Sequence, residues 1–434
     1  MNHFKLLLHR MIGIDIIKVF SLNALSTFVR MLAGMVSVKV VAVIIGPAGI
    51  ALLGQLNNFS SILLGMANGG INSGITKYVA EYKDYENKVK GYISNALRIT
   101  LVCSFVISLI LIFFCKPLSK MILLSKEYYY VIIVFGITIS LFTLNGLVVS
   151  ILNGYKEFKL YVRVSILGTF AGLLYSIILV FLWGLPGAMI NAVTFQSIMF
   201  FVTLWMCRKL PWMKREYFVH KFDKPIIKKY LGYSLMTLTS LALLPTCQML
   251  LRGYVISELS PTDAGIWEGM NRISNMYLSV ITSAFSIYYL PRLSEITNPI
   301  ELRIEILRCY KVVVPMLLGI SVLIFLLKHI ILWVLFTPDF YPMERLFGWQ
   351  LAGDMFKMCS WLLSYLMVAK AMTGKFVITE IVFTLSYLAL AFFFMKLNGI
   401  IGLTQGYLIN YIIYFTVMIF IFRNILVLKC RNRV

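Results

Sequence analysis

Charged residues are scarce in this chain, and acidic residues are the scarcest. Only 13% of the 434 residues are charged, and 18 Asp and Glu stand against 40 Lys and Arg, which gives a formal net charge of +22. A soluble domain has about a quarter of its residues charged and about half apolar, whereas 60% of this chain is hydrophobic. The composition excludes an ordinary soluble domain and predicts a polytopic membrane protein.

Sequence signatures of enzymes are also missing. The chain has no GxxxxGK[ST], HExxH or GxSxG sequence, and these are the local patterns of phosphate-binding loops, zinc proteases and serine hydrolases. None of its four histidines lies deep in an apolar run, and its seven cysteines have no CxxC spacing, so the cysteines are interpreted as small apolar fillers. We therefore expect no enzymatic activity, no metal and no cofactor.

Long apolar runs dominate what is present. A helix needs about 20 mostly apolar residues to cross a bilayer, and these runs are too long for the strands of an outer-membrane barrel. The first twenty residues lack a compact apolar run that ends in a small-residue cleavage site, so no removable signal peptide is expected. Twelve spans are predicted: 22–45, 49–72, 93–115, 130–152, 161–183, 187–207, 230–256, 264–290, 312–336, 346–369, 376–396 and 400–422.

The basic residues predict the orientation and a boundary. Counted over the loops and the adjoining parts of the spans, the side of the two termini holds 28 Lys and Arg, against 6 on the other side, so both termini are expected in the cytoplasm. Residues 208–229 contain two prolines and eight basic residues and separate six spans from six. We expect lobes at 1–207 and 230–434, joined by a cytoplasmic connector that rests on anionic headgroups rather than on nucleic acid.

The two halves of the chain also contain similar short sequences at corresponding spans. Pro47-Ala48-Gly49-Ile50 opens the second span, and Asp263-Ala264-Gly265-Ile266 opens the eighth. Six spans separate the two copies, so matching helices keep the same orientation, as in transporters whose halves are related by an axis along the membrane normal. Chance similarity between two apolar stretches is the alternative.

The loop after the eighth span carries a helix-start signal. Asn298-Pro299-Ile300-Glu301 offers an N-cap residue, a proline at the first helical position and an acid in the first turn. The following LRIEILRCYK alternates charge with Leu and Ile. It predicts a separate amphipathic helix on the membrane surface.

Several cations fall inside apolar spans. Residues 264–293 carry Glu268 and Arg272 within the first turns, four residues apart, so these two can pair on one helix face. A charge at the bilayer centre costs roughly 2.5–3.5 kcal/mol and therefore faces protein or water. The corresponding helices of the two halves also contribute Arg30, Lys39, Lys77 and Arg252. We predict a hydrated cationic cavity for a phosphate, diphosphate or acidic sugar; snorkelling or pairing with carbonyl groups is the alternative.

Other polar side chains extend this set. Asp354 and Lys357 lie three residues apart in the tenth span and face the same way. Desolvation raises the pKa of a buried carboxylate, and a nearby cation lowers it, so Asp354 could exchange a proton and couple transport to protons. A static ion pair between Asp354 and Lys357 is the alternative. Asn57 in the second span and Asn271 in the eighth suit sugar hydroxyls, and amides of this kind also hold helices together.

Five stretches of the chain carry a family resemblance. They are GPAGIALLGQL from Gly46, GGINSGITKYVAEY from Gly69, AGIWEGMNRIS from Ala264, ITSAFSIYYLPRLSEIT from Ile281 and WQLAGDMFKMCSWLLSYLMVAKA from Trp349. These stretches resemble the Wzx-type lipid-linked oligosaccharide flippases, within the superfamily of multidrug, oligosaccharidyl-lipid and polysaccharide exporters. They look especially similar to the branch that moves the lipid-linked trisaccharide of enterobacterial common antigen (lipid III), and to O-antigen translocases of lipopolysaccharide biosynthesis.

The resemblance implies an all-α, V-shaped fold of two six-helix lobes that alternate between inward- and outward-open states. It implies transport of an undecaprenyl diphosphate-linked oligosaccharide across the bacterial inner membrane, driven by an ion gradient, with the bilayer and other glycan-assembly membrane proteins as partners. The positions that match its motifs are Lys77, Glu81, Asp354, Lys357 and Lys370, and of these Glu81, Asp354 and Lys357 are assigned to ion coupling.

Two other functions stay open at this point. A cation-coupled multidrug exporter of the same superfamily should have an acidic lumen for cationic drugs, whereas the charges here are basic. A membrane glycan polymerase or ligase should carry a sizeable periplasmic loop with catalytic residues, and no predicted loop on that side is long.

Overall fold

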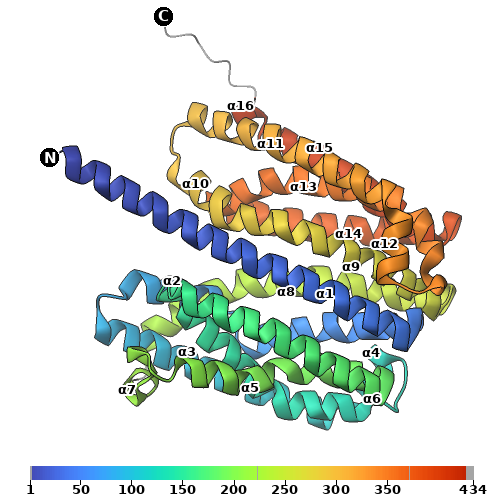
Figure 1. Ribbon diagram of the computed structural model, residues 1–434, viewed down its shortest axis with the longest axis horizontal. Coiled ribbons are helices and arrows are strands. Elements are labelled where there is room, and N and C mark those ends of the chain that lie inside the picture. Colours follow the sequence, from blue (N-terminus) through green and yellow to red (C-terminus); the bar gives the residue numbers. More distant parts are fainter. Residues whose placement is uncertain (1, 222, 371, 427–434) are drawn as a thin grey trace, which may run out of the picture. The chain divides into compact units, whose positions relative to one another are not determined.

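The computed structural model describes residues 2–221, 223–370 and 372–426, and regular structure in this part is helical (Figure 1). The longer elements pack as bundles of roughly antiparallel helices. In chain order the elements are α1 (Asn2–Ala67), α2 (Asn72–Tyr82), α3 (Glu86–Phe113), α4 (Cys115–Leu123), α5 (Tyr129–Gly154), α6 (Phe158–Cys207), η1 (Pro211–Met213), α7 (Arg215–Phe218), α8 (Lys224–Glu258), α9 (Pro261–Ala284), η2 (Phe285–Tyr289), α10 (Leu290–Glu295), α11 (Pro299–Leu326), α12 (Lys328–Leu335), η3 (Pro338–Leu346), α13 (Phe347–Ala369), α14 (Thr373–Asn398), α15 (Ile400–Ile421) and α16 (Arg423–Leu426).

Seven helices of the described part are long and apolar enough to cross a membrane. Two of them, 26–67 and 158–207, each overlap two of the predicted spans, so nine of the twelve predicted spans overlap these seven helices. The predicted span 312–336 is divided in the structure, because α11 ends at Leu326 and α12 begins at Lys328. The other three predicted spans lie mainly in α8, α9 and α13, which carry the buried charges described below. The fold is that of an all-helical polytopic membrane protein.

Glycine residues fold the longest helices back on themselves. At 1.5 Å per residue, the 50 residues of α6 would extend for about 75 Å, more than twice the roughly 30 Å hydrocarbon core. The backbone of α6 turns at Gly184 (φ 59°), and α1 turns in the same way at Gly46 (φ 64°), just before Pro47. Gly399 (φ 57°) joins α14 to α15. A positive φ strains residues that carry a Cβ, so glycine is required at these turns.

A second glycine follows each turn by three residues and lets the two arms approach closely. A Cβ at Gly187 would lie 1.9 Å from the carbonyl oxygen of Leu179, and one at Gly402 would lie 2.1 Å from that of Phe394. At Gly49 the nearest atom would be the Ile45 side chain, at 2.7 Å. The three turns are therefore hairpins with almost no connecting loop.

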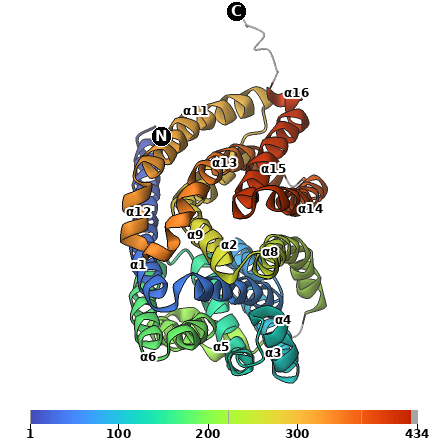
Figure 2. The same cartoon turned by 90° about the vertical axis from the view of Figure 1, so that its right-hand side faces the viewer.

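The chain divides by its internal contacts into two units. Unit 1 comprises 1–44 and 55–245, and unit 2 comprises 45–54 and 246–434, so one boundary falls at Pro245 within α8. In unit 1 the helices α3, α5 and α6 pack side by side (Figure 1), and buried residues of α2, α3, α5 and the 208–230 segment form a common core. In unit 2 the helix α13 packs between α11 and α15, with α14 against α15 (Figure 2). The predicted lobes 1–207 and 230–434 stay a prediction.

The start of α11 confirms one sequence prediction and corrects another. The Asn298 side chain accepts a hydrogen bond from the backbone N–H of Ile300 at 2.9 Å, and Pro299 occupies the first helical position, as predicted. The separate surface helix was wrong, because α11 runs without interruption from Pro299 to Leu326 and enters the apolar span directly. The amphipathic residues form its first turns.

The basic segment 208–229 folds against α3. The Ser94 hydroxyl and the Arg98 guanidinium donate to the carbonyl oxygen of His220, and the backbone N–H of Asp223 donates to the Asn95 amide oxygen at 3.2 Å. Slightly earlier in the segment, Glu216 of α7 forms an ion pair with Lys90 of α3 at 2.9 Å. The connector is a folded element of unit 1.

Candidate functional site

The best-defined charge cluster lies in unit 2, where two arginines share one carboxylate. Glu268 of α9 accepts a hydrogen bond from Nη2 of Arg252 on α8, and its other oxygen lies 3.4 Å from Nε of Arg272 one turn further along α9. This confirms the predicted pairing of Glu268 with Arg272 and adds Arg252. Two guanidinium groups against one carboxylate leave a net positive charge.

The Arg252 side chain is enclosed. It is only 1% exposed, against 18% for Arg272, and its guanidinium carbon lies 5.7 Å from the centre of the Trp267 ring, within the range of a cation–π contact. The α1 backbone covers the pair at Gly54, where a Cβ would lie 2.7 Å from the Glu268 carboxyl carbon. Packing of this kind fixes Arg252 and Glu268, whereas Arg272 keeps partial access.

Asp354 forms the second cluster of unit 2. The carboxylate is fully buried on α13 and accepts hydrogen bonds from the Tyr277 hydroxyl at 2.6 Å, the Tyr407 hydroxyl at 2.7 Å and the Gln350 amide at 3.3 Å. Tyr277 belongs to α9 and Tyr407 to α15, so one carboxylate links three helices.

The Lys357 ammonium lies among aromatic rings and forms no direct ion pair with the Asp354 carboxylate. Its ammonium nitrogen lies 5.1 Å from the centre of the Trp361 ring and 5.8 Å from those of Tyr407 and Tyr411. Among the ion pairs of the described residues, none joins Lys357 to Asp354. The geometry does not support the alternative of a static ion pair between these two residues.

The other predicted cations belong to unit 1. Arg30 is exposed, donates to the Thr27 hydroxyl at 3.2 Å and lines a pocket of about 220 Å³ with Asn145 and Gln196, whose amides are joined by a 2.8 Å hydrogen bond. Lys39 is half-buried in α1. Lys77 is exposed on α2, with its ammonium 5.4 Å from the centre of the Tyr78 ring.

The remaining predicted residues divide between the units. Asn57 is exposed on α1, and Glu81 is exposed at the end of α2. Asn271 is half-buried on α9, three residues after Glu268, so the two occupy neighbouring positions on the helix surface. Arg252, Arg272, Asn271, Asp354 and Lys357 thus come from unit 2, and the other predicted site residues come from unit 1.

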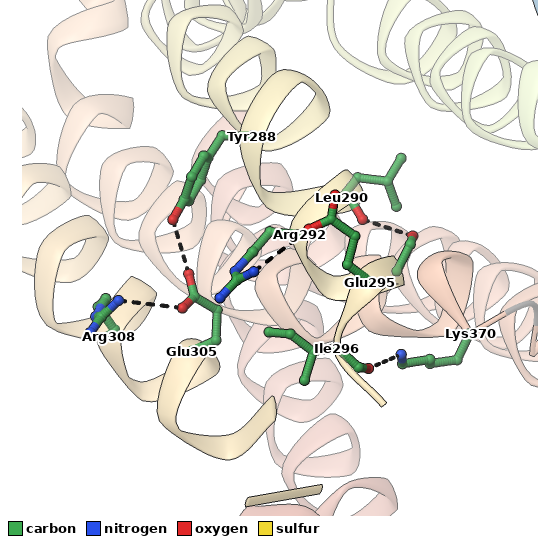
Figure 3. Close-up of polar contacts among 9 residues, drawn as sticks. Tyr288, Leu290, Arg292, Glu295, Ile296, Glu305, Arg308 and Lys370 are labelled. Atoms are coloured by element: carbon green, nitrogen blue, oxygen red, sulfur yellow. Dashed lines mark hydrogen bonds and ion pairs between the residues drawn. The ribbon is translucent and has the colours of Figure 1, made fainter. Parts of the chain in front are cut away.

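Lys370, which matches a motif of the resemblance, has a structural contact. Its ammonium donates to the backbone carbonyl oxygen of Ile296, just beyond α10 (Figure 3). In the same region Glu305 of α11 accepts a hydrogen bond from the Tyr288 hydroxyl at 3.2 Å and lies 3.6 Å from Arg308. These contacts tie the end of α13 and the start of α11 to the η2–α10 segment.

Sequence reasoning missed the tyrosines around Asp354. Tyr277 and Tyr407 lie inside predicted spans, away from the span ends where tyrosine usually marks the interface. Mid-span tyrosines need a hydrogen-bond partner when buried, and that signal could have linked them to the carboxylate. Within the described residues, no group of three His, Cys, Asp or Glu side chains is arranged to hold a metal ion.

Two known proteins with similar sequences are named lipid III flippases. The chain is 27% identical over 394 residues to the lipid III flippase of Escherichia coli (strain K12), covering 91% of this chain and 95% of that protein. It shows the same identity and coverage to the lipid III flippase of Shigella flexneri. These named relatives are transport proteins and not enzymes.

Solved structures share the fold. An inward-facing multidrug resistance MATE family transporter of the MOP superfamily superposes with a TM-score of 0.74 at 14% identity, covering 93% of this chain and all of that one. The lipid II flippase MurJ, in an inward closed conformation, gives 0.72 at 16% identity, covering 94% and 87%. A family model described as polysaccharide biosynthesis protein matches residues 16–297, more than half of the chain. The chain is a multi-pass membrane protein that belongs to this polysaccharide biosynthesis family.

Proposed function

We propose that this protein flips an undecaprenyl diphosphate-linked oligosaccharide from the cytoplasmic to the periplasmic leaflet of the bacterial inner membrane. The observation that carries the proposal is the surplus of positive charge at Glu268, where Arg252 and Arg272 share one carboxylate inside an apolar protein. A diphosphate is the kind of group that offsets such a charge. The likeness to proteins named lipid III flippases supports a glycan lipid, either lipid III or an O-antigen unit, as the substrate.

The proposed architecture is two six-helix lobes, 1–207 and 230–434, joined by the segment 208–229, with both termini in the cytoplasm. The charge bias of the loops supports the orientation, and the fold shared with a MATE transporter and MurJ supports twelve spans. The lobes would expose the binding site to each side in turn, while the lipid tail stays in the bilayer.

In this proposal the cations bind the diphosphate and the amides bind sugar. Arg272 is the best placed cation of unit 2, because it keeps partial exposure while Arg252 and Glu268 neutralise each other. Asn271 precedes it on the same helix and offers an amide to sugar hydroxyls. In unit 1 the proposed ligands are Arg30, Lys39, Lys77 and Asn57.

Ion coupling is assigned to Asp354, with Lys357 and Glu81 in supporting roles. An ionised carboxylate can accept from both Tyr277 and Tyr407, as observed. A protonated carboxyl carries its own donor hydrogen and has less acceptor capacity, so proton uptake would weaken the link to one of the two tyrosines. Because these belong to α9 and α15, the protonation state would change how the helices of unit 2 are tied together.

The cation proposal is tested by the double variant Arg30→Gln and Arg272→Gln. Each substitution removes a charge-assisted contact worth about 1.5–3 kcal/mol, so we expect glycan delivery to the periplasm to fall by more than tenfold. The readout is the accumulation of complete glycan lipid on the cytoplasmic side, with membrane insertion verified by immunoblot. The matched control is Lys159→Gln with Lys209→Gln, two exposed lysines outside the site. Normal delivery in the Arg30/Arg272 variant would refute the assignment.

The coupling proposal is tested by Asp354→Asn. We expect transport in proteoliposomes to become independent of an imposed pH gradient. The amide of asparagine has nearly the same size as the carboxylate and can still form hydrogen bonds, but it cannot exchange a proton. Tyr277→Phe is the matched variant: it removes one hydrogen bond but keeps the carboxylate, so gradient dependence should persist at a lower rate. Gradient-dependent transport by Asp354→Asn would rule out Asp354 as the coupling residue.

A further inference from the structure

A large basic pocket in unit 1 is lined by residues that the proposed transport site does not use. It has a volume of about 870 Å³ and is formed by the end of α2, the first turns of α3 and the segment that leads into α8. Its walls include four lysines, Lys88, Lys221, Lys224 and Lys229, and one carboxylate, Asp223. Asp223 accepts a hydrogen bond from the backbone N–H of Ile226 at 3.4 Å, in the first turn of α8. The excess of ammonium groups makes the pocket suitable for an anion.

The wall of the pocket is held in place by buried groups. Ser94 and Asn95 of α3 are completely buried, and they bond to the backbone of His220, Lys221 and Asp223. The lysines of this segment therefore project from an anchored backbone. A preformed arrangement of this kind lowers the entropic cost of binding a ligand.

A stack of tyrosines positions Lys229. The Tyr92 ring stacks on those of Tyr78 and Tyr82, with centres 4.7 Å and 5.3 Å apart, and the Lys229 ammonium donates to the Tyr92 hydroxyl at 3.1 Å. The same ammonium lies about 6 Å from the centres of all three rings. The hydrogen bond to Tyr92 raises the pKa of Lys229, so this lysine stays charged at neutral pH.

The pocket shares one face of α3 with an exposed apolar stripe. Five helical turns are eighteen residues, so Asn87 lies directly in line with Phe105, and Lys88 with Val106. Phe105 is 62% exposed and Val106 is 48% exposed, within an apolar span. A molecule with a charged head in the pocket could therefore lay a hydrocarbon chain along the same helix face.

We propose that the pocket binds the phosphate of an anionic phospholipid headgroup, with the acyl chains against the Phe105 and Val106 face of α3. The proposal places the headgroup in the cytoplasmic leaflet, and it depends on the predicted orientation but not on which glycan is transported. A soluble phosphate would use the lysines but not the apolar face, which is why the lipid is the better fit.

The test uses the double variant Lys88→Gln and Lys224→Gln in the full chain. Each basic residue near an anionic membrane surface strengthens binding by about fivefold, so we expect phosphatidylglycerol to bind about thirtyfold more weakly. Native mass spectrometry of the detergent-solubilised protein, titrated with phosphatidylglycerol, measures this directly. Both lysines are exposed, so the variant should fold, and its unfolding temperature checks that it does.

Controls distinguish a bound lipid from a soluble anion and from a general loss of positive charge. Lys159→Gln with Lys375→Gln removes the same charge at two exposed positions outside the pocket and outside the 208–229 segment, and should leave phosphatidylglycerol binding within about twofold of the original. Phosphatidylethanolamine should bind all variants equally weakly. Unchanged phosphatidylglycerol binding in the Lys88/Lys224 variant would overturn the site, and displacement of the lipid by millimolar inorganic phosphate would overturn the lipid assignment in favour of a soluble anion.

Discussion

Replacing Glu268 by Gln is expected to lower the free energy of unfolding by about 3–5 kcal/mol, the usual cost of removing one partner from a buried ion pair. Arg252 is only 1% exposed and would keep its charge while losing the carboxylate that contacts it. The backbone at Gly54 closes over the pair, which leaves little room for the guanidinium to turn toward water. Thermal unfolding of the purified protein in detergent measures the change.

Two matched variants separate the charge effect from a packing effect. Arg272→Gln removes the more exposed guanidinium, which lies 3.4 Å from Glu268. It should lower the free energy of unfolding by about 1 kcal/mol or less. Arg252→Met combined with Glu268→Leu removes both buried charges and should be much closer to the original stability than Glu268→Gln alone. Equal destabilisation by Glu268→Gln and Arg272→Gln would contradict the interpretation of an enclosed pair.

The glycine hairpins are expected to be equally intolerant of change. Alanine at Gly187 or Gly402 would place a Cβ about 2 Å from a carbonyl oxygen of the preceding helical arm. Backbone atoms cannot move away as the end of a flexible side chain can. The free energy of unfolding should therefore fall by about 3 kcal/mol or more, at the upper end of overpacking effects. We expect both variants to reach the membrane in low amounts and to unfold at a much lower temperature.

Gly319→Ala is the control for this prediction. Gly319 lies inside α11, and a Cβ there meets no atom within 4 Å. Alanine favours a helix over glycine by roughly 1 kcal/mol, so this variant should be as stable as the original or slightly more stable. Full expression and an unchanged unfolding temperature for Gly402→Ala would show that the arms of the α14–α15 hairpin are not in close contact.

Local features of the fold were readable from sequence, and contacts between helices were not. The Asn298 cap and the Glu268–Arg272 pair involve residues a few positions apart, so helical geometry alone predicts them. Arg252 meets Glu268 from another helix, and Tyr277 and Tyr407 meet Asp354 from two others. No spacing rule within one helix carries that information.

The one clear error came from the same limitation. The sequence LRIEILRCYK looks like a separate surface helix because its charges alternate with Leu and Ile. Nothing in that pattern shows whether the helix stops before the apolar span begins, and α11 does not stop, passing through Pro315 as well. The family resemblance, in contrast, rested on five stretches with their order along the chain and was confirmed.

The loopless hairpins at Gly46, Gly184 and Gly399 limit how the topology can be mapped. An epitope or protease site inserted at these turns would push apart the helical arms that are in close contact at Gly187 and Gly402. The inserted tag would then report the topology of a disrupted protein. The same loopless turns leave very little polypeptide outside the bilayer for an antibody to recognise. A membrane map of this chain should instead place its tags between α4 and α5, where residues 124–128 connect two separate helices.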